Sequence, residues 1–348
     1  MTPPPPQPPI RFPALDALRG LAVLMVVYDH LFAVAGERMA GGAFAPVHWV
    51  REWLSGPLGI IQDFGWFGVC LFFLISGFVI THSARRESLR VFVLRRVFRI
   101  GPPLAVAVLV VAALDLLAGT RRPWTDYLYG LTLAGYFTVP QIVVLGVAWT
   151  LVIEVIFYAL MAAVSPLFKL AHPAIGTAVA TLVPLAVIIH ARDLGDSFFL
   201  FAASAAYLPV LLIGSAFYLR KTAAASVGTV ALLVLANAGV FMFGLRSIHT
   251  SFLPLNNSYA LSMVYAAGLF LLTVDRGAPR VLRWAGDISY SLYLLHGTLG
   301  FLFVQQALAW GAGPAAPWLA AAASLGISYL MYRLVERPSI ELGKRLAR

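Results

Sequence analysis

Long apolar runs separated by short polar segments extend along almost the whole chain. Ten of these runs are long enough to cross a bilayer as α-helices, which need about 20 apolar residues each. They cover residues 15–35, 58–82, 101–118, 146–167, 173–190, 198–219, 225–244, 258–275, 288–309 and 315–335. A backbone inside lipid must satisfy its hydrogen bonds within the helix. The pattern therefore predicts an all-α, polytopic membrane helix bundle with about ten transmembrane helices.

Three further segments do not fit this pattern of spans. Residues 127–142 are apolar but short, contain two glycines and end near Pro140, so we expect a re-entrant or interfacial segment there. Proline is abundant in residues 1–13, which predicts a disordered cytoplasmic tail. Residues 341–348 are predicted to form a basic cytoplasmic tail, and residues 14–340 a single transmembrane domain.

The basic residues decide between ten and eleven spans. With ten spans and a cytoplasmic N-terminus, 19 of the 25 lysines and arginines lie inside and six outside. An eleventh span at 127–142 would reverse the later segments and leave 10 inside and 15 outside. Because Lys and Arg concentrate on the cytoplasmic side, we predict ten spans with both termini in the cytoplasm.

The composition agrees with a membrane location and excludes several classes of protein. Of 348 residues, 60% are hydrophobic and only 11% charged, against about 25% charged in soluble domains. The net charge of +10 arises in the segments between apolar runs, where it sets topology, so no nucleic-acid partner is expected. The single cysteine, Cys70, lies in an apolar run, so we expect neither a disulfide framework nor a metal site.

The first span carries Arg19 and, eleven residues later, His30. At about 100° and 1.5 Å per residue, both face the same side, about 16 Å apart along the axis. Ionisable groups within spans are costly and frequently functional. We therefore treat both as candidate site residues, with Tyr28 and Asp29 beside them. The alternative is that Arg19 snorkels to headgroups and His30 makes a structural contact between helices.

An acidic residue, Glu154, lies in the fourth span, which begins near Trp149. It is predicted about one and a half turns below the outer surface, in the same half of the membrane as His30. A carboxylate there needs a partner, and His30 or Tyr28 is within reach. An acid and an imidazole at matched depth suit general acid–base catalysis. The alternative is a structural hydrogen bond between helices.

Two other spans carry polar residues. The ninth span contains Ser291 and places His296 near the middle of the membrane. This histidine either binds a ligand or makes a structural hydrogen bond. In the second span, Ser76 and Gly77 predict close packing of helices.

Arginine is concentrated in residues 85–99, where we expect a cytoplasmic loop with six arginines in fifteen residues. Arg95, Arg96 and Arg99 would present guanidinium groups to phosphate oxygens, with Arg86 nearby. Such a site would suit a nucleotide-bearing donor such as coenzyme A. The alternative is a loop that binds lipid headgroups. A Walker-type phosphate loop is absent from the sequence, which leaves ATP-driven transport unsupported.

Six motifs, in order over residues 12–340, resemble those of the acyltransferase-3 family. Members are multi-pass membrane acyltransferases that O-acylate bacterial surface carbohydrates and some antibiotics. One motif has Thr150 where the family has serine. The motifs fall on Arg19 with His30, and on residues 72–78, 95–102, 149–158, 289–296 and 335–338.

The resemblance implies a cytoplasmic acyl-CoA donor, usually acetyl-CoA, and no permanently bound cofactor. The acceptor would be a hydroxyl of a carbohydrate or glycolipid at or near the outer face of a bacterial inner (plasma) membrane. In this hypothesis the arginine cluster binds phosphates and Arg19 lines the path of the pantetheine arm. His30 is the general base or is transiently acylated, assisted by Glu154. Supporting roles are expected for Tyr28, Asp29, Trp149, Tyr158, Ser291 and His296.

The competing class is a secondary transporter or flippase of a polar or glycan substrate. Arg, His and Glu within spans are typical of such proteins as well. The lack of an inverted repeat and the clustering of arginines at one mouth favour the enzyme. A purely structural scaffold would leave the polar residues within the spans unexplained.

Overall fold

The computed structural model describes residues 12–37, 44–170, 172–248 and 258–347, and within these ranges it is helical with no β-strand. Eight helical stretches there are long and apolar enough to cross a membrane: Pro13–Gly36, Gln62–Arg86, Leu89–Leu117, Gly146–Lys169, Asp196–Lys221, Val227–Ser247, Ser289–Ala309 and Gly313–Leu346. Two shorter apolar helices are α8 (Pro173–Ile189) and α12 (Ser258–Thr273). Each of these segments overlaps one predicted run, which confirms the polytopic α-helical bundle.

The elements follow one another with short connections. The other α-helices are α1 (Pro13–Val27), α3 (Ala45–Val50), α4 (Gly65–Arg86), α5 (Leu89–Leu117), α6 (Trp124–Thr132), α7 (Trp149–Leu170), α9 (Asp196–Ala205), α10 (Leu208–Lys221), α11 (Val227–Ser247), α13 (Arg280–Asp287), α14 (Ser289–Leu295), α15 (Phe301–Ala309), α16 (Ala316–Met331) and α17 (Arg337–Leu346). The described residues also form short 3₁₀ turns at η3 (Gln62–Phe64), η4 (Ala134–Phe137), η5 (Gly146–Ala148) and η7 (Gly313–Ala315).

Wider π-helical turns, with hydrogen bonds from residue i to i+5, interrupt several of the long helices. Such turns are η1 (Tyr28–Gly36), η2 (Arg51–Ser55), η6 (His296–Gly300) and η8 (Tyr332–Glu336). Three of them continue an α-helix within a candidate span: η1 follows α1, η6 follows α14, and η8 follows α16.

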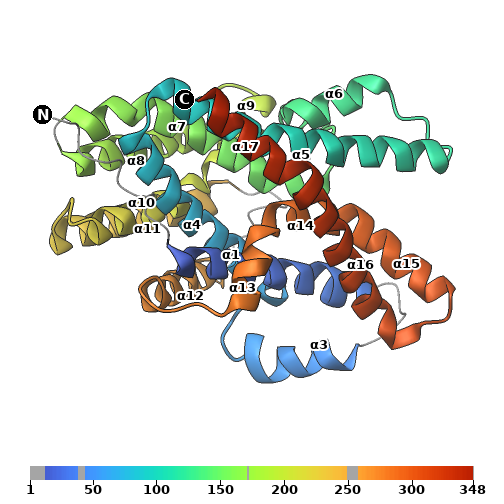
Figure 1. The fold of residues 1–348 in the computed structure, drawn as a ribbon. Coiled ribbons are helices and arrows are strands. Elements are labelled where there is room, and N and C mark those ends of the chain that lie inside the picture. Colours follow the sequence, from blue (N-terminus) through green and yellow to red (C-terminus); the bar gives the residue numbers. More distant parts are fainter. Residues whose placement is uncertain (1–11, 38–43, 171, 249–257, 348) are drawn as a thin grey trace, which may run out of the picture.

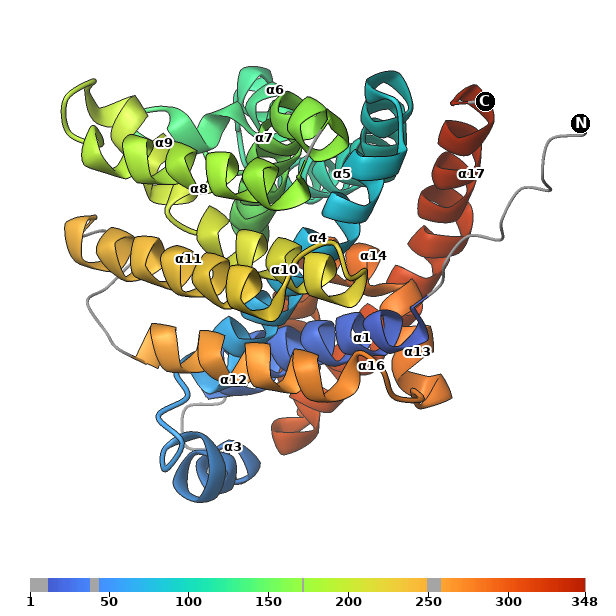
Figure 2. The same cartoon turned by 90° about the vertical axis from the view of Figure 1, so that its left-hand side faces the viewer.

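The centre of the bundle is α4, the most deeply buried of the candidate spans. It packs against α1, α7, α10 and α12 (Figure 1). Along α1 the two ends of the molecule differ: α13 lies beside the first turns of α1, and α3 lies towards its other end (Figure 2). We call these the α13 end and the α3 end.

Reciprocal glycine contacts bring two helix pairs close together. A Cβ on Gly77 of α4 would collide with the carbonyl of Leu211, and a Cβ on Gly214 of α10 with the carbonyl of Leu74. The same arrangement joins Gly20 of α1 to the α13 backbone, and Gly286 of α13 back to the α1 backbone. Small residues allow such close crossings, which stabilise helix pairs by van der Waals contact within a membrane. The packing role predicted around Gly77 agrees with this geometry.

The arginine-rich segment is helical rather than a loop. Helix α5 begins at Leu89, where the Ser88 hydroxyl accepts a hydrogen bond from the Val91 amide as an N-cap. It continues through Pro102 and Pro103 to Leu117. The prediction of a loop over 85–99 is therefore wrong, because arginine is a good helix former and the cap lies before most of the cluster.

The remaining predicted segments have simple outcomes. Residues 127–142 form the end of α6 and the turn η4, too short to cross a membrane, and α6 packs against α5. Of the predicted tail 1–13, residues 1–11 lie outside the described residues, and Pro13 begins α1. Residues 341–346, within the predicted basic tail, continue α17, which packs against α5.

Candidate active site

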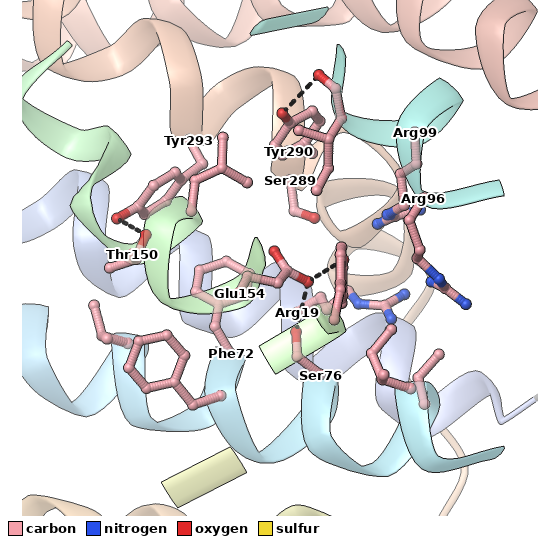
Figure 3. Close-up of a pocket in the computed structure, with 17 residues that line it drawn as sticks. Arg19, Phe72, Ser76, Arg96, Arg99, Thr150, Glu154, Ser289, Tyr290 and Tyr293 are labelled. Carbon is pink, nitrogen blue, oxygen red and sulfur yellow. Dashed lines mark hydrogen bonds between the residues drawn. The ribbon is translucent and has the colours of Figure 1, made fainter. Parts of the chain in front are cut away.

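Two polar cavities follow one another along the helix that carries Arg19 and His30. The first, here the arginine cavity, has a volume of about 220 Å³ and is lined by α1, α4, α5, α7 and α14 (Figure 3). The second, the histidine cavity, has a volume of about 730 Å³ and lies nearer the α3 end. Val69 and Tyr293 line both cavities. The path from one cavity to the other therefore passes between these two side chains.

The arginine cavity has three guanidinium groups in its lining: Arg19 from α1 and Arg96 and Arg99 from α5. Arg96 donates to the Ser83 hydroxyl at 2.7 Å, and its guanidinium lies 5.6 Å from the centre of the Tyr158 ring. Among the described residues, none forms a hydrogen bond or ion pair with Arg99. In Figure 3, Arg96 and Arg99 occupy one end of the cavity. This end has guanidinium donors available for an anionic ligand.

The other two predicted phosphate-binding residues, Arg86 and Arg95, line neither cavity. Both are exposed, and Arg95 donates to a carboxylate oxygen of Glu87 at 2.6 Å. Adjacent residues on a helix point about 100° apart. Arg95 therefore points away when Arg96 faces the cavity, so a consecutive run of arginines cannot face one cavity together.

Glu154 also lines the arginine cavity. One of its carboxylate oxygens accepts hydrogen bonds from the Tyr158 hydroxyl at 2.6 Å and from the Ser76 hydroxyl at 3.1 Å. The pairing expected with His30 or Tyr28 is not what the structure contains, since His30 lines the other cavity. Depth in the membrane was matched correctly, but a buried wall separates the two groups, and depth alone does not reveal a wall.

His30 pairs with the second predicted histidine instead. His30 Nδ1 lies 2.7 Å from His296 Nε2, and the two rings stack with centroids 4.9 Å apart. His296 is fully buried, whereas the side chain of His30 is 28% exposed. The residue that faces the cavity is therefore His30, and His296 lies behind it.

The backbone determines which nitrogen atoms carry hydrogen. His296 Nδ1 lies 2.8 Å from the carbonyl oxygen of Tyr293 and 3.0 Å from that of Leu292. Carbonyl oxygens only accept, so we assign the hydrogen to Nδ1 and the lone pair to Nε2. His30 Nδ1 then donates to His296, and His30 Nε2 keeps its lone pair. Asp29 Oδ2 lies 3.8 Å from this nitrogen, close enough to favour a proton there.

Aromatic side chains surround much of the histidine cavity, including Trp66, Trp149, Tyr207, Tyr259 and Phe301. Trp149 therefore lies where sequence analysis expected support for the site. Tyr28 does not line either cavity, and its ring stacks on Phe32 with centroids 5.8 Å apart. Flat apolar faces with polar edges are suited to a ring-shaped substrate that carries hydroxyl groups.

An ion-pair network lies next to the histidine cavity, which Asp63 lines. Arg51, in the segment before α4, donates to both carboxylate oxygens of Asp63 at 2.7 and 2.5 Å and to Glu37 at 2.8 Å. The hydrogen bonds to Asp63, with a smaller contribution from Glu37, raise the pKa of Arg51 above its ordinary value despite partial burial. The network fastens the segment of α3 and η2 to the start of the α4 span.

A third cavity, here the mouth cavity, lies at the α13 end and shares Arg19 and Arg99 with the arginine cavity. Its lining adds Arg337 and Lys344 of α17 and Glu336 of η8. Sequence analysis did not select these residues. Their signal was the motif at 335–338 and the basic charge that follows it. Glu336 is 2% exposed and accepts hydrogen bonds from the hydroxyl and amide of Ser291, which explains the place of that predicted support residue.

His30, His296 and Glu336 each lie on a π-helical turn, in η1, η6 and η8. Such turns are frequent at functional sites because they leave the regular ladder and re-aim side chains. Sequence periodicity does not reveal them, since the apolar pattern continues through each turn.

Buried polar cavities inside a membrane helix bundle define an integral membrane protein with an internal binding or reaction site. A family model described as an acyltransferase domain, Acyl_transf_3, matches residues 12–333. The chain belongs to this family and is a membrane protein of the acyltransferase class. No curated protein and no solved structure matches the chain.

Proposed function

We propose that this protein transfers an acyl group, acetyl in the first place, from acyl-CoA to a hydroxyl group of a carbohydrate or glycolipid. The α13 end would face the cytoplasm and the α3 end the outer side of a bacterial inner membrane. The observation that supports this most strongly is the order of the cavities. Guanidinium groups line the two nearer the α13 end, and a histidine with a free Nε2 lines the next.

The donor would enter at the mouth cavity. Its phosphates have Arg337, Lys344, Arg19 and Arg99 as cationic partners in the combined lining, and guanidinium groups bind phosphate oxygens in pairs. The thioester would then point through the arginine cavity towards Tyr293. Arg96 completes the cationic lining, so the proposal keeps Arg96 and Arg99 as donor-binding residues and drops Arg86 and Arg95.

The acceptor would bind among the aromatic side chains of the histidine cavity. His30 Nε2 takes the proton of the acceptor hydroxyl as its oxygen attacks the thioester carbonyl. The carbon–sulfur bond breaks, and the CoA thiolate takes that proton, giving an ester and free CoA. Asp29 stabilises the imidazolium form of His30 during the step, and His296 fixes its orientation.

Glu154 acts from the donor side in this proposal. Its carboxylate lies among three guanidinium groups and is held by Tyr158 and Ser76. There it holds the cationic side chains apart and leaves the phosphate-binding donors directed towards the cavity. The assistance to His30 expected from sequence is assigned instead to Asp29 and His296.

Release of CoA tests the proposal. Membranes from cells with the gene and from cells lacking it receive acetyl-CoA, and free thiol is measured with the native acceptors present. An enzyme releases CoA in excess of the gene-deleted membranes, and mass spectrometry of surface glycans then finds an acetyl group that the deleted strain lacks. Equal release from both membranes would support a transporter or flippase instead.

A further inference from the structure

The wall between the arginine and histidine cavities is built from three helices. Tyr293 comes from α14, Val69 from α4 and Thr150 from α7. Tyr293 and Val69 face each other across the place where the two cavities meet, because both line each cavity. In Figure 3, Tyr293 and Thr150 lie at the end of the arginine cavity opposite Arg96 and Arg99, with Glu154 between.

The ring of Tyr293 is held in place from several directions. Thr150 donates to its hydroxyl at 2.7 Å, and that hydroxyl donates to the carbonyl of Val147 at 3.0 Å. Phe72 packs edge-on with centroids 5.8 Å apart, and His296 lies on another side at 5.6 Å. Because the hydroxyl proton is already donated to a carbonyl, the phenol is not a free donor for a reacting oxygen. Its structural contribution is a fixed wall.

Position in the chain connects this wall to both sites. Tyr293 lies one turn before His296, and Thr150 lies one turn before Glu154. A group that passes from the guanidinium end to His30 must therefore pass the ring of Tyr293 and the branched side chain of Val69. The width of this passage is set by side chains rather than by backbone.

We propose that Tyr293, fixed by Thr150, and Val69 form a size filter for the transferred acyl group, which admits acetyl and rejects longer chains. This inference rests on the proposed function, since it takes the arginine cavity as the donor site. Acetyl adds a single methyl group beyond the thioester carbonyl, whereas butyryl adds two further methylenes. Exclusion of one methylene by a close-fitting apolar site changes specificity by about 10-fold or more.

The test compares acetyl-CoA with butyryl-CoA as donors, using membranes of the gene-deleted strain that carry each variant. The measured quantity is the ratio of the CoA release rates. Val69→Ala widens the passage and should lower the acetyl-to-butyryl ratio about 10-fold. Val69→Ile narrows it and should raise the ratio, so the two substitutions act in opposite directions.

Tyr293→Phe keeps the ring but removes both hydrogen bonds, and it should lower the ratio by a smaller factor. Val79→Ala is the matched control, because Val79 lines the arginine cavity and the neighbouring cavity beside Phe12 and Asp16 but not the histidine cavity. It should leave the ratio unchanged. Immunoblots of the membranes normalise each rate to the amount of protein.

The outcomes separate this inference from the proposed function. Absence of gene-dependent CoA release by the wild type from either donor would overturn both. Wild-type release from acetyl-CoA with the same ratio in Val69→Ala, Val69→Ile and Val79→Ala would overturn the filter and leave the enzyme in place. Equal shifts in Val69→Ala and Val79→Ala would also overturn it, because the effect would then belong to the whole donor cavity.

Discussion

The arginine and histidine cavities are neighbours along one helix, yet they differ in how their polar groups are satisfied. In the arginine cavity, three cationic side chains surround one carboxylate, and Arg99 makes no hydrogen bond or ion pair with any other described residue. In the histidine cavity, a chain of hydrogen bonds runs from backbone carbonyls through His296 to His30 and ends on one free nitrogen.

This difference matches two different tasks. Unpaired guanidinium groups bind a charged ligand strongly because ligand binding supplies the missing partner. An imidazole fixed in one tautomer is suited to proton transfer, since the reacting nitrogen is already free and directed. The first cavity is thus built to hold a molecule, and the second to act on one.

Removal of His30 should have the largest effect on this contrast. We expect His30→Ala to lower acyl transfer about 10³-fold, because no other described group offers a free basic nitrogen in that cavity. The measurement is CoA release from acetyl-CoA, with the binding of labelled acetyl-CoA measured in parallel and expected to persist. His190→Ala is the control, since His190 is exposed and pairs with Asp193. Transfer at the wild-type rate in His30→Ala would remove His30 from the mechanism.

Loss of the partner histidine should have the next largest effect. His296→Ala leaves the His30 ring free to turn, and we expect kcat to fall about 10²-fold with little change in the KM for acyl-CoA. In His296→Gln, the amide oxygen can still accept from His30 Nδ1, so part of the rate should return. If glutamine restores nothing while the protein remains folded, the tautomer assignment is wrong.

The donor-binding arginines should show the opposite kinetic behaviour. Arg99→Gln and Arg96→Gln should each raise the KM for acetyl-CoA about 10-fold with a smaller change in kcat, since a lost charged hydrogen bond costs about 1.5–3 kcal/mol. Arg95→Gln is a matched control on the same helix and should leave KM unchanged. An equal increase in all three variants would mean that the cluster acts only through its general charge.

The smallest effect is expected beside the histidine cavity. Arg51→Gln deprives Asp63 and Glu37 of their cationic partner and should lower the free energy of unfolding by about 1–3 kcal/mol. Thermal unfolding in detergent measures this loss, and Arg337→Gln, which breaks an exposed pair with Glu341, should have little effect. The KM for acetyl-CoA should not change in Arg51→Gln. A large increase in that KM would contradict the separation of the two cavities.

The fold was predictable because its main determinant is the length of apolar runs. Ten runs gave ten candidate membrane helices, and the short stretch at 127–142 was correctly left without a span. The limits were local. The start of α5 depended on the Ser88 cap, which hydrophobic length does not detect.

The candidate residues were predictable by type and depth, but not by partner. His30, His296, Arg96, Arg99 and Glu154 all line or border the cavities, as their cost inside a span suggested. The pairing of His30 with His296 instead of Glu154 depends on the rotation of three helices about their axes. Helical periodicity fixes relative directions within one helix only, and the π-helical turns alter even those.

The reciprocal glycine crossings have a mechanical consequence. Where Gly77 meets Leu211 and Gly20 meets Leu282, backbone touches backbone, and neither helix pair has room to move closer. Each crossing acts as a pivot: α4 and α1 can tilt about these points but not slide along their partners without collision. Any gate on the path of the acyl group must then open by rotation of side chains such as Tyr293, and the helices that carry Arg19 and Val69 serve as a rigid frame around it.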